Sequence, residues 1–201
     1  MATRRNSLVG WNSEPVGAKA RIEQAALSLF VEKGVDASTT REIAQRAGVS
    51  EGAIYRHFDS KDQLASTMFL AVHTRLATLI REAAREKRSI AEQASAVIDA
   101  YCATADADFP LFTFHLLYTH RFLPTPEGVD NPVDAVEDMI SVAMKRREIA
   151  RGDPAFIAGL ALGLVLQTAL QIHYGRLDGP LSQYADKLVN AALAVMKTHT
   201  R

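Results

Sequence analysis

The chain has 201 residues, 48% of them hydrophobic and 23% charged, a composition typical of a folded globular protein that excludes a disordered chain. Lysine plus arginine and aspartate plus glutamate number 23 each, so net charge argues neither for nor against a nucleic-acid partner. The single cysteine, Cys102, excludes an internal disulfide and a cysteine-rich zinc site, and it favours a reducing, cytoplasmic compartment. The most apolar stretch, residues 155–166, is too short to span a bilayer, and we expect no membrane segment, signal peptide, metal or cofactor.

Residues 1–15 show no hydrophobic periodicity, and we expect them to form a flexible tail. Arg4, Arg5 and Trp11 lie in this segment without a regular spacing. The alternative interpretation is a basic arm that helps to hold DNA.

The next segment predicts a helix, a tight turn and a second helix. After a first amphipathic helix near residues 16–33, Thr39 and Glu42 have the spacing of a capping box, which marks a helix start. Gly48 supplies the left-handed backbone that ends this helix, and Ser50 is the expected N-cap of the next one. Because the second helix of such a pair fits the major groove of DNA, the arrangement predicts a helix-turn-helix.

Hydrogen-bond donors are expected on the outer surface of the second helix of this pair. Ile54 and Phe58 are four residues apart and should face inward, which leaves Tyr55, Arg56 and His57 outside. All three side chains can donate, whereas phosphate oxygens and most base edges in the major groove accept. The alternative is a helical hairpin in which the tyrosine and the histidine only pack, and it leaves the combination of cap, turn glycine and donors unexplained.

The stretch TTREIAQRAGVSEGAIYRHFDSKDQL, residues 39–64, resembles the DNA-binding signature of TetR-family transcriptional regulators. The preceding segment, RIEQAALSLFVEKGVDAST, resembles the first helix of that family. The specific match covers roughly residues 18–65, and the remainder resembles the family only in length, helical character and the late ARGDP helix break.

This resemblance implies two sets of DNA-binding residues. The implied phosphate contacts are Thr40, Ser50, Tyr55, His57 and Lys61. The implied base-reading residues are Arg41, Glu51, Gly52, Ala53, Tyr55 and Arg56. Glu51 is the exception in chemistry, because a carboxylate accepts from cytosine but repels phosphate.

Nearly every segment beyond residue 60 also predicts helix, with breakers between the segments. The expected helices lie near residues 61–86, 90–106, 108–122, 132–150, 154–176 and 181–198. No segment alternates with period two, so the predicted fold class is all-α with about nine helices. We expect a three-helix, helix-turn-helix DNA-binding domain at residues 16–62, followed by a helical ligand-binding and dimerisation domain at residues 63–201.

The aromatic-rich stretch at residues 109–118 predicts a ligand pocket, because a pocket needs apolar walls and a few polar groups. The expected ligand-binding residues are Cys102, Phe112, His115, Tyr118 and Met139. The alternative is that these side chains form the core of a helical domain. The family resemblance favours a cavity, and its ligand should be a small, largely apolar effector.

Residues 156–164 are apolar on every side, and such a helix must be buried on every side. One face needs a partner, which predicts a homodimer held by a four-helix bundle around a two-fold axis. The expected interface residues are Phe156, Gly159, Leu160, Gly163, Gln167, Leu170, Tyr174, Tyr184, Leu188, Ala192 and Val195. The alternative is that the last helix covers the apolar strip within one chain.

Together these features predict a ligand-responsive DNA-binding regulator that is not an enzyme. We expect a repressor that binds a near-palindromic DNA operator as a dimer and is released by a small molecule. One alternative is a small helical enzyme with His115 as general base, for which the sequence offers no nucleophile or phosphate loop. Another keeps DNA binding and takes a protein partner as the signal.

Overall fold

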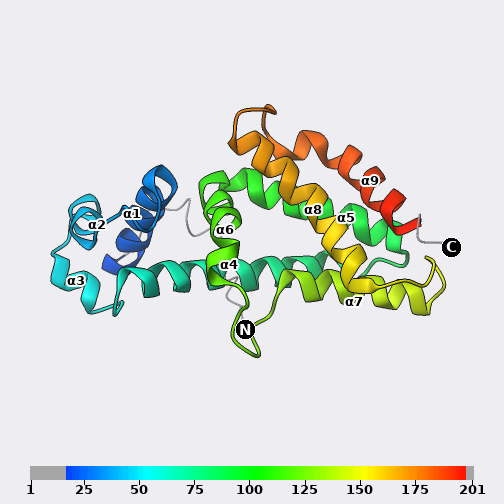
Figure 1. Cartoon of the computed structure of the whole chain (residues 1–201), viewed down its shortest axis with the longest axis horizontal. Helices are drawn as coiled ribbons and strands as arrows, with labels where there is room; N and C mark the ends of the chain where they lie inside the picture. Colours follow the sequence, from blue (N-terminus) through cyan, green and yellow to red (C-terminus); the bar gives the residue numbers. More distant parts are fainter. Residues whose placement is uncertain (1–16, 198–201) are drawn as a thin grey trace, which may run out of the picture. The chain divides into compact units, whose positions relative to one another are not determined.

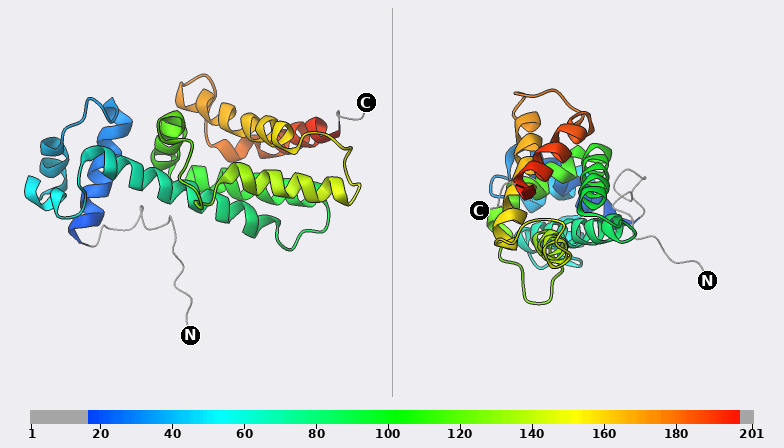
Figure 2. Two further views of the ribbon diagram at one scale, coloured as in Figure 1. Left: turned by 60° about the horizontal axis from the view of Figure 1, so that its bottom comes forward. Right: turned by 90° about the vertical axis from the view of Figure 1, so that its right-hand side faces the viewer.

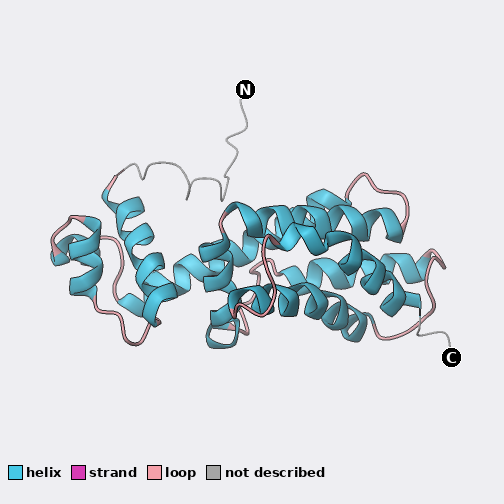
Figure 3. Ribbon diagram, turned by 90° about the horizontal axis from the view of Figure 1, so that it is seen from above, coloured by secondary structure: helices cyan, strands magenta, loops and turns pink. Residues whose placement is uncertain are grey.

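The computed structural model describes residues 17–197, which form helices and loops without a strand (Figure 3). The helices are α1 (Ala18–Lys33), α2 (Thr40–Ala47), α3 (Glu51–Tyr55), α4 (Lys61–Ala84), α5 (Ile90–Ala107), α6 (Phe109–Phe122), α7 (Pro132–Lys145), α8 (Pro154–His173) and α9 (Ala185–Lys197), with a 3-10 helix, η2 (Leu181–Tyr184), before the last (Figure 1). Over the described residues, the prediction of an all-α fold with about nine helices is confirmed. The predicted tail with Arg4, Arg5 and Trp11 lies outside these residues.

The described chain divides into two compact units that do not follow chain order. The first unit runs up to Val72 and includes Asp108–Pro124, so it holds α1, α2, α3, the first half of α4, and α6. The second unit holds the rest of α4 with α5, α7, α8, η2 and α9. The sequence places α6 in the ligand-binding domain, whereas its contacts group it with the N-terminal helices. The functional boundary expected after residue 62 stays a prediction.

One face of α1 and one face of α6 build the core of the first unit. Ile22, Ala26 and Phe30 of α1 are fully buried. The ring of Phe30 stacks on the ring of Phe114 in α6, with 5.9 Å between their centroids. Burying an isoleucine or phenylalanine side chain stabilises the fold by about 1.5–3 kcal/mol, and truncating a buried phenylalanine to alanine costs about 3–5 kcal/mol.

Polar caps set where the helices begin. The Thr39 hydroxyl accepts from the Glu42 backbone N–H at 3.2 Å, and a Glu42 carboxylate oxygen accepts from the Thr39 N–H at 2.9 Å. The predicted capping box is therefore confirmed, and a cap of this kind contributes about 1 kcal/mol. Asp108 and Asp153 cap α6 and α8 in the same manner through their carboxylates.

The second unit surrounds an apolar core to which α8 contributes one face. Ile157, Ala161 and Val165 are buried in this unit, where α8 packs on α7 and α9 (Figures 1 and 2). The helix is longer than the apolar stretch suggested: it has 20 residues, and an 18-residue window within it has a mean hydropathy of 1.9. Length and composition alone would let it cross a membrane, although one such helix is weak evidence. Only 28% of that window is buried, so much of its apolar surface faces outward.

Candidate nucleic-acid interface

The predicted turn between α2 and α3 is present. Gly48 ends α2 with φ 64° and ψ 40°, the left-handed conformation that glycine adopts without a steric penalty. Ser50 is the N-cap residue of α3, although its side chain makes no capping bond. Ile54 is fully buried and Phe58 nearly so, which anchors this segment on the core. The helix-turn-helix therefore has its inward side where the sequence predicts it.

Three donors lie on the outside of this motif, as predicted. Tyr55 is 53% exposed, and Arg56 and His57 are also exposed. The helix itself is shorter than expected, because α3 ends at Tyr55 and Arg56 is its C-cap. The backbone N–H of His57 donates to the Ile54 carbonyl at 2.9 Å, so the turn continues past the helix end. The three side chains thus follow one another around a tight exit turn.

Arg41 and Gly52 are exposed, in agreement with their predicted base-reading role, but Ala53 is not. Ala53 is 4% exposed, and its side chain belongs to the inner face of α3, which packs on α2. The expected role of Ala53 in base reading is therefore wrong: neighbouring positions on so short a helix can both turn inward.

Thr40 and Glu51, the first residues of α2 and α3, are joined by a hydrogen bond. The Thr40 hydroxyl donates to a carboxylate oxygen of Glu51 at 2.5 Å. A hydroxyl carries a single proton, so the Thr40 hydroxyl cannot donate to a phosphate while this bond exists, and only the backbone N–H of Thr40 is left for that role. In this structure the Thr40 hydroxyl therefore orients Glu51, and a phosphate contact of Thr40 stays a prediction.

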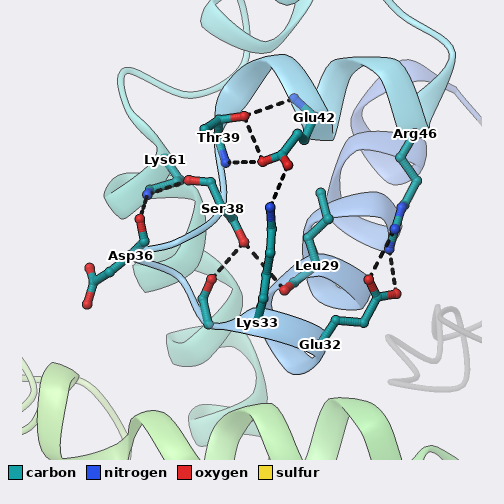
Figure 4. Close-up of polar contacts among 10 residues, drawn as sticks. Leu29, Glu32, Lys33, Asp36, Ser38, Thr39, Glu42, Arg46 and Lys61 are labelled. Atoms are coloured by element: carbon teal, nitrogen blue, oxygen red, sulfur yellow. Dashed lines mark hydrogen bonds and ion pairs between the residues drawn. The ribbon is translucent and has the colours of Figure 1, made fainter.

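Lys61 makes internal contacts that the sequence did not indicate, and its expected phosphate contact stays a prediction. Its ammonium donates to the backbone carbonyls of Asp36 at 3.1 Å and Ser38 at 2.7 Å (Figure 4). The Ser38 hydroxyl in turn donates to the Gly34 carbonyl at 2.7 Å. Lys61 therefore fixes the start of α4 to the loop between α1 and α2, and most of its donor capacity is used inside the protein.

Ion pairs fasten α2 to α1 and so support α3. The Arg46 guanidinium binds both carboxylate oxygens of Glu32, at 2.6 and 3.1 Å, and Lys33 binds Glu42 at 2.5 Å (Figure 4). The hydrogen bond from Lys33, with further ones from Thr39, lowers the pKa of Glu42 from its ordinary 4.5 to about 2. Exposed ion pairs contribute little to stability unless their geometry is good, as it is in the two-point contact between Arg46 and Glu32. These pairs therefore help to fix the orientation of α2 on α1.

The C-terminal half of α6 holds the same loop, which the sequence did not indicate. The Tyr118 hydroxyl accepts from the Val35 N–H at 2.8 Å. The Arg121 guanidinium contacts both Asp36 carboxylate oxygens at 2.8 and 2.9 Å and reaches Asp62 at 2.7 Å. No local pattern marks Arg121, because its partners lie 59 and 85 residues away.

The five predicted ligand-binding residues do not line one cavity. Phe112, His115 and Tyr118 belong to the first unit, whereas Cys102 and Met139 belong to the second. His115 is 5% exposed and stacks on Phe69 with 4.8 Å between ring centroids. The aromatic face of α6 is therefore core, as the alternative interpretation held. His115 therefore belongs to this core and presents almost no surface.

An apolar cavity of about 30 Å³ lies inside the second unit. Met139 lines it, together with side chains that include Tyr101, Val165 and Met196. Its volume is enough for about two water molecules, and an apolar cavity of this size tends to stay dry. Cys102 is fully buried beside Tyr101 in the chain, and burial raises the pKa of its thiol to about 11, so it is a poor nucleophile.

The outward face of α8 carries large apolar side chains and two glycines. Phe156 is 55% exposed, Tyr174 is 61% exposed and Leu160 is also exposed. Gly159 and Gly163 share this face, and a Cβ built on either glycine would meet no atom within 4 Å. Nothing within residues 17–197 therefore requires glycine at these two positions.

The remaining predicted interface residues, which lie in α8, η2 and α9, divide into a buried group and a group that keeps some exposed surface. Leu188 and Ala192 are buried in their own unit, where α9 packs on α5 and α8. A side chain covered by its own unit has no surface left for a partner, so the structure removes these two from the expected interface. The other predicted residues that keep exposed or half-buried surface are Gln167, Leu170, Tyr184 and Val195.

Comparison with known proteins locates the resemblance on this motif. Residues 22–68 match the family described as "Bacterial regulatory proteins, tetR family". An HTH-type transcriptional repressor of Mycobacterium tuberculosis is 42% identical over 65 residues, which are 32% of this chain and 35% of the repressor. An uncharacterized HTH-type transcriptional regulator of the same species is 25% identical over 199 residues, or 96% of each chain.

The matched segment thus spans about a third of the length of the first relative. Among solved structures, the regulator FadR from Bacillus subtilis in complex with stearoyl-CoA is similar with a TM-score of 0.73 and 18% identity. That alignment covers 87% of this chain and 97% of FadR, and at such identity it carries information on the fold alone.

Proposed function

We propose, from the premise that the chain belongs to the TetR family of bacterial regulatory proteins, that it is a repressor which binds a near-palindromic DNA operator as a homodimer. One observation carries this proposal: Tyr55, Arg56 and His57 are exposed together at the end of a helix-turn-helix. Three adjacent donors suit phosphate oxygens and base acceptors. We further propose that the protein is cytoplasmic and catalyses no reaction.

A gel-shift assay tests the DNA-binding part. The purified chain is titrated into DNA from upstream of its own gene and into unrelated DNA of equal length, at two salt concentrations. We expect a specific complex with the upstream DNA that survives the higher salt, because base contacts add to the salt-sensitive phosphate contacts. Equal affinity for both DNAs at each salt concentration would contradict a sequence-specific regulator.

The proposed dimer uses the outward face of α8. Gly159 and Gly163 lie in open space beside the exposed Phe156 and Leu160. Apolar side chains provide the driving force for association, and glycines let a partner helix approach closely. Two-fold symmetry then presents two copies of α3 to successive major grooves of DNA. Sedimentation at micromolar protein concentration tests this part, and a stable monomer would contradict it.

The proposed effector enters the second unit at the apolar cavity. The FadR neighbour binds stearoyl-CoA, and an acyl chain is a ligand that an apolar lining of this kind suits. At about 30 Å³ the cavity must widen to admit such a chain. Met139 and Met196 line it and are flexible enough to move. The proposal is therefore a small or chain-like, largely apolar effector that loosens DNA binding when it widens the cavity.

A thermal-shift series tests the effector proposal. Acyl-CoA thioesters and free fatty acids of increasing length are each added to the protein. A ligand present at a hundred times its dissociation constant stabilises the fold by about 2.7 kcal/mol. We expect stabilisation that grows with chain length and is lost in a Val165→Glu variant, whose carboxylate would enter the cavity lining. Equal stabilisation of both proteins would place the ligand elsewhere.

A further inference from the structure

We propose that Glu51 is a specificity-determining residue, which accepts a hydrogen bond from the amino group of a cytosine in the major groove, and that Thr40 positions its carboxylate. The inference rests on the proposed DNA-binding function and adds the identity of one base in each half-site. It follows from the way in which Glu51 is held, from the open space beside it and from the chemistry of base edges.

Glu51 is held by a neutral group, unlike Glu32 of α1 and Glu42 of α2. Glu32 pairs with Arg46 and Glu42 pairs with Lys33, so a cation offsets each of those negative charges. Glu51 instead receives the hydroxyl proton of Thr40 at 2.5 Å. This bond restricts where the carboxylate can point and leaves its negative charge in place. A carboxylate offers about four lone-pair positions, so it can still accept from an outside donor.

Gly52 keeps the space next to Glu51 clear. A Cβ built on Gly52 would meet no atom within 4 Å, and its φ lies outside the left-handed region. Glycine at an exposed helical position costs about 1 kcal/mol relative to alanine. Neither the backbone conformation nor packing against any described residue requires this glycine. A close approach by the partner at this point explains it.

The uncompensated charge restricts which base Glu51 can contact. A carboxylate only accepts hydrogen bonds, and the major groove offers amino donors only on cytosine and adenine. On adenine the N7 acceptor lies beside the amino group and would face the second carboxylate oxygen. On cytosine's own edge, the amino group lies beside a C–H group and no acceptor, so the second carboxylate oxygen meets no repulsion from that base. Guanine and thymine would each place an acceptor oxygen against the carboxylate. Cytosine is therefore the base that Glu51 selects.

Selection from random duplex DNA at a fixed salt concentration tests the inference. The wild type should select a site with one invariant cytosine in each half, and Glu51→Gln should exchange that cytosine for adenine, which glutamine contacts at two atoms. Thr40→Val should weaken the cytosine preference while the other selected bases stay, and Thr40→Ser, which keeps the hydroxyl, should retain it. Melting curves show that each variant is folded.

The outcomes separate the two levels of the proposal. If the wild type selects no sequence at all, the proposed DNA-binding function is wrong. If the wild type selects a site and Glu51→Gln selects the same site with the same base preferences, the function stands and the role of Glu51 is wrong. If Thr40→Val keeps the full cytosine preference, Thr40 is not a positioning residue.

A base analogue isolates the proposed bond. In the selected site, the cytosine is replaced by pyrimidin-2-one, which lacks the amino group. We expect the wild type to lose about tenfold in affinity, the effect of one good base contact, and Glu51→Ala to lose nothing further. Equal losses for both proteins would show that the amino group is not bound by Glu51.

Discussion

Helices α3 and α8 both expose glycine, at Gly52 in the first and at Gly159 and Gly163 in the second. In neither helix does packing among the described residues require glycine, because a Cβ at each position would meet no atom within 4 Å. The neighbours differ: Glu51 and Tyr55 flank the first site, whereas Phe156 and Leu160 flank the others. Exposed glycine thus lies beside polar side chains in α3 and beside apolar side chains in α8. The proposed partners match these flanking side chains: DNA for the polar surface of α3, and a second subunit for the apolar surface of α8.

The largest expected effect comes from filling the apolar strip with a charge. Gly163→Glu should give a monomer, because the carboxylate would be buried against the partner helix. Operator affinity should then fall about a hundredfold or more, since two linked contacts become one. Sedimentation and gel shift measure the two changes.

Ala91→Glu, which adds the same charge at an exposed position of α5, serves as the control and should stay dimeric. A melting curve identifies a variant that has lost its fold. A folded, dimeric Gly163→Glu protein would show that α8 does not form the interface.

A smaller effect is expected at the polar surface. Tyr55→Phe removes one hydroxyl donor from an exposed ring and should weaken DNA binding by about 1–1.5 kcal/mol. The loss should be similar for operator and unrelated DNA, because phosphates carry no sequence information. Fluorescence anisotropy with both DNAs measures it, and the variant should remain dimeric. A loss confined to the operator would instead make Tyr55 a base-reading residue.

Replacing Gly52 with alanine should raise the stability of the fold and weaken DNA binding. The free energy of unfolding of the variant should rise by up to about 1 kcal/mol, because alanine favours the helix and its Cβ would meet no described atom within 4 Å. DNA binding should weaken if the duplex approaches this backbone closely. Denaturant unfolding and gel shift together provide the test, and unchanged DNA affinity would mean that the cleared space at α3 has another purpose.

Acid should destabilise the fold in part through Glu42, which helps to hold α2 on α1. The lowered pKa of Glu42 means that its stabilising contribution is complete above pH 4.5 and is lost as the pH falls towards 2. Glu42→Gln should therefore flatten the decline in melting temperature over that range. Glu127→Gln, at an exposed loop glutamate, should not flatten it. An identical decline in wild type and Glu42→Gln would mean that the bond from Lys33 contributes nothing in solution.

The sequence predicted those features that depend on neighbouring residues. Thr39 with Glu42 marked the start of α2, and Gly48 marked its end, because caps and left-handed turns use particular residue types at fixed spacing. Helix ends without such residues were missed. Helix α7 was expected to run to about residue 150 but ends at Lys145. Two residues later, Arg147 adopts a φ of 59° although it is not glycine.

Assignments that depend on distant contacts could not be predicted. The aromatic side of α6 suggested a pocket, yet Phe114 stacks on Phe30 and Tyr118 binds Val35, both in α1 or the loop after it. Composition is the same for a pocket wall and for a core, so only the partner helix distinguishes them. The role of Lys61 was missed for a related reason, since its carbonyl partners carry no sequence signal.

The burial of Cys102 makes the chain suited to spectroscopic distance measurement. It is the only cysteine, it is fully buried, and its raised pKa of about 11 keeps the thiol protonated at neutral pH. A thiol-reactive spin label would therefore react almost entirely with a cysteine introduced on the surface, for example Gln45→Cys on α2, without removal of the native one. In a two-fold dimer that single label gives one intersubunit distance. Recording it before and after addition of an acyl-CoA would test whether the proposed effector changes the distance between the two helix-turn-helix motifs of the proposed dimer.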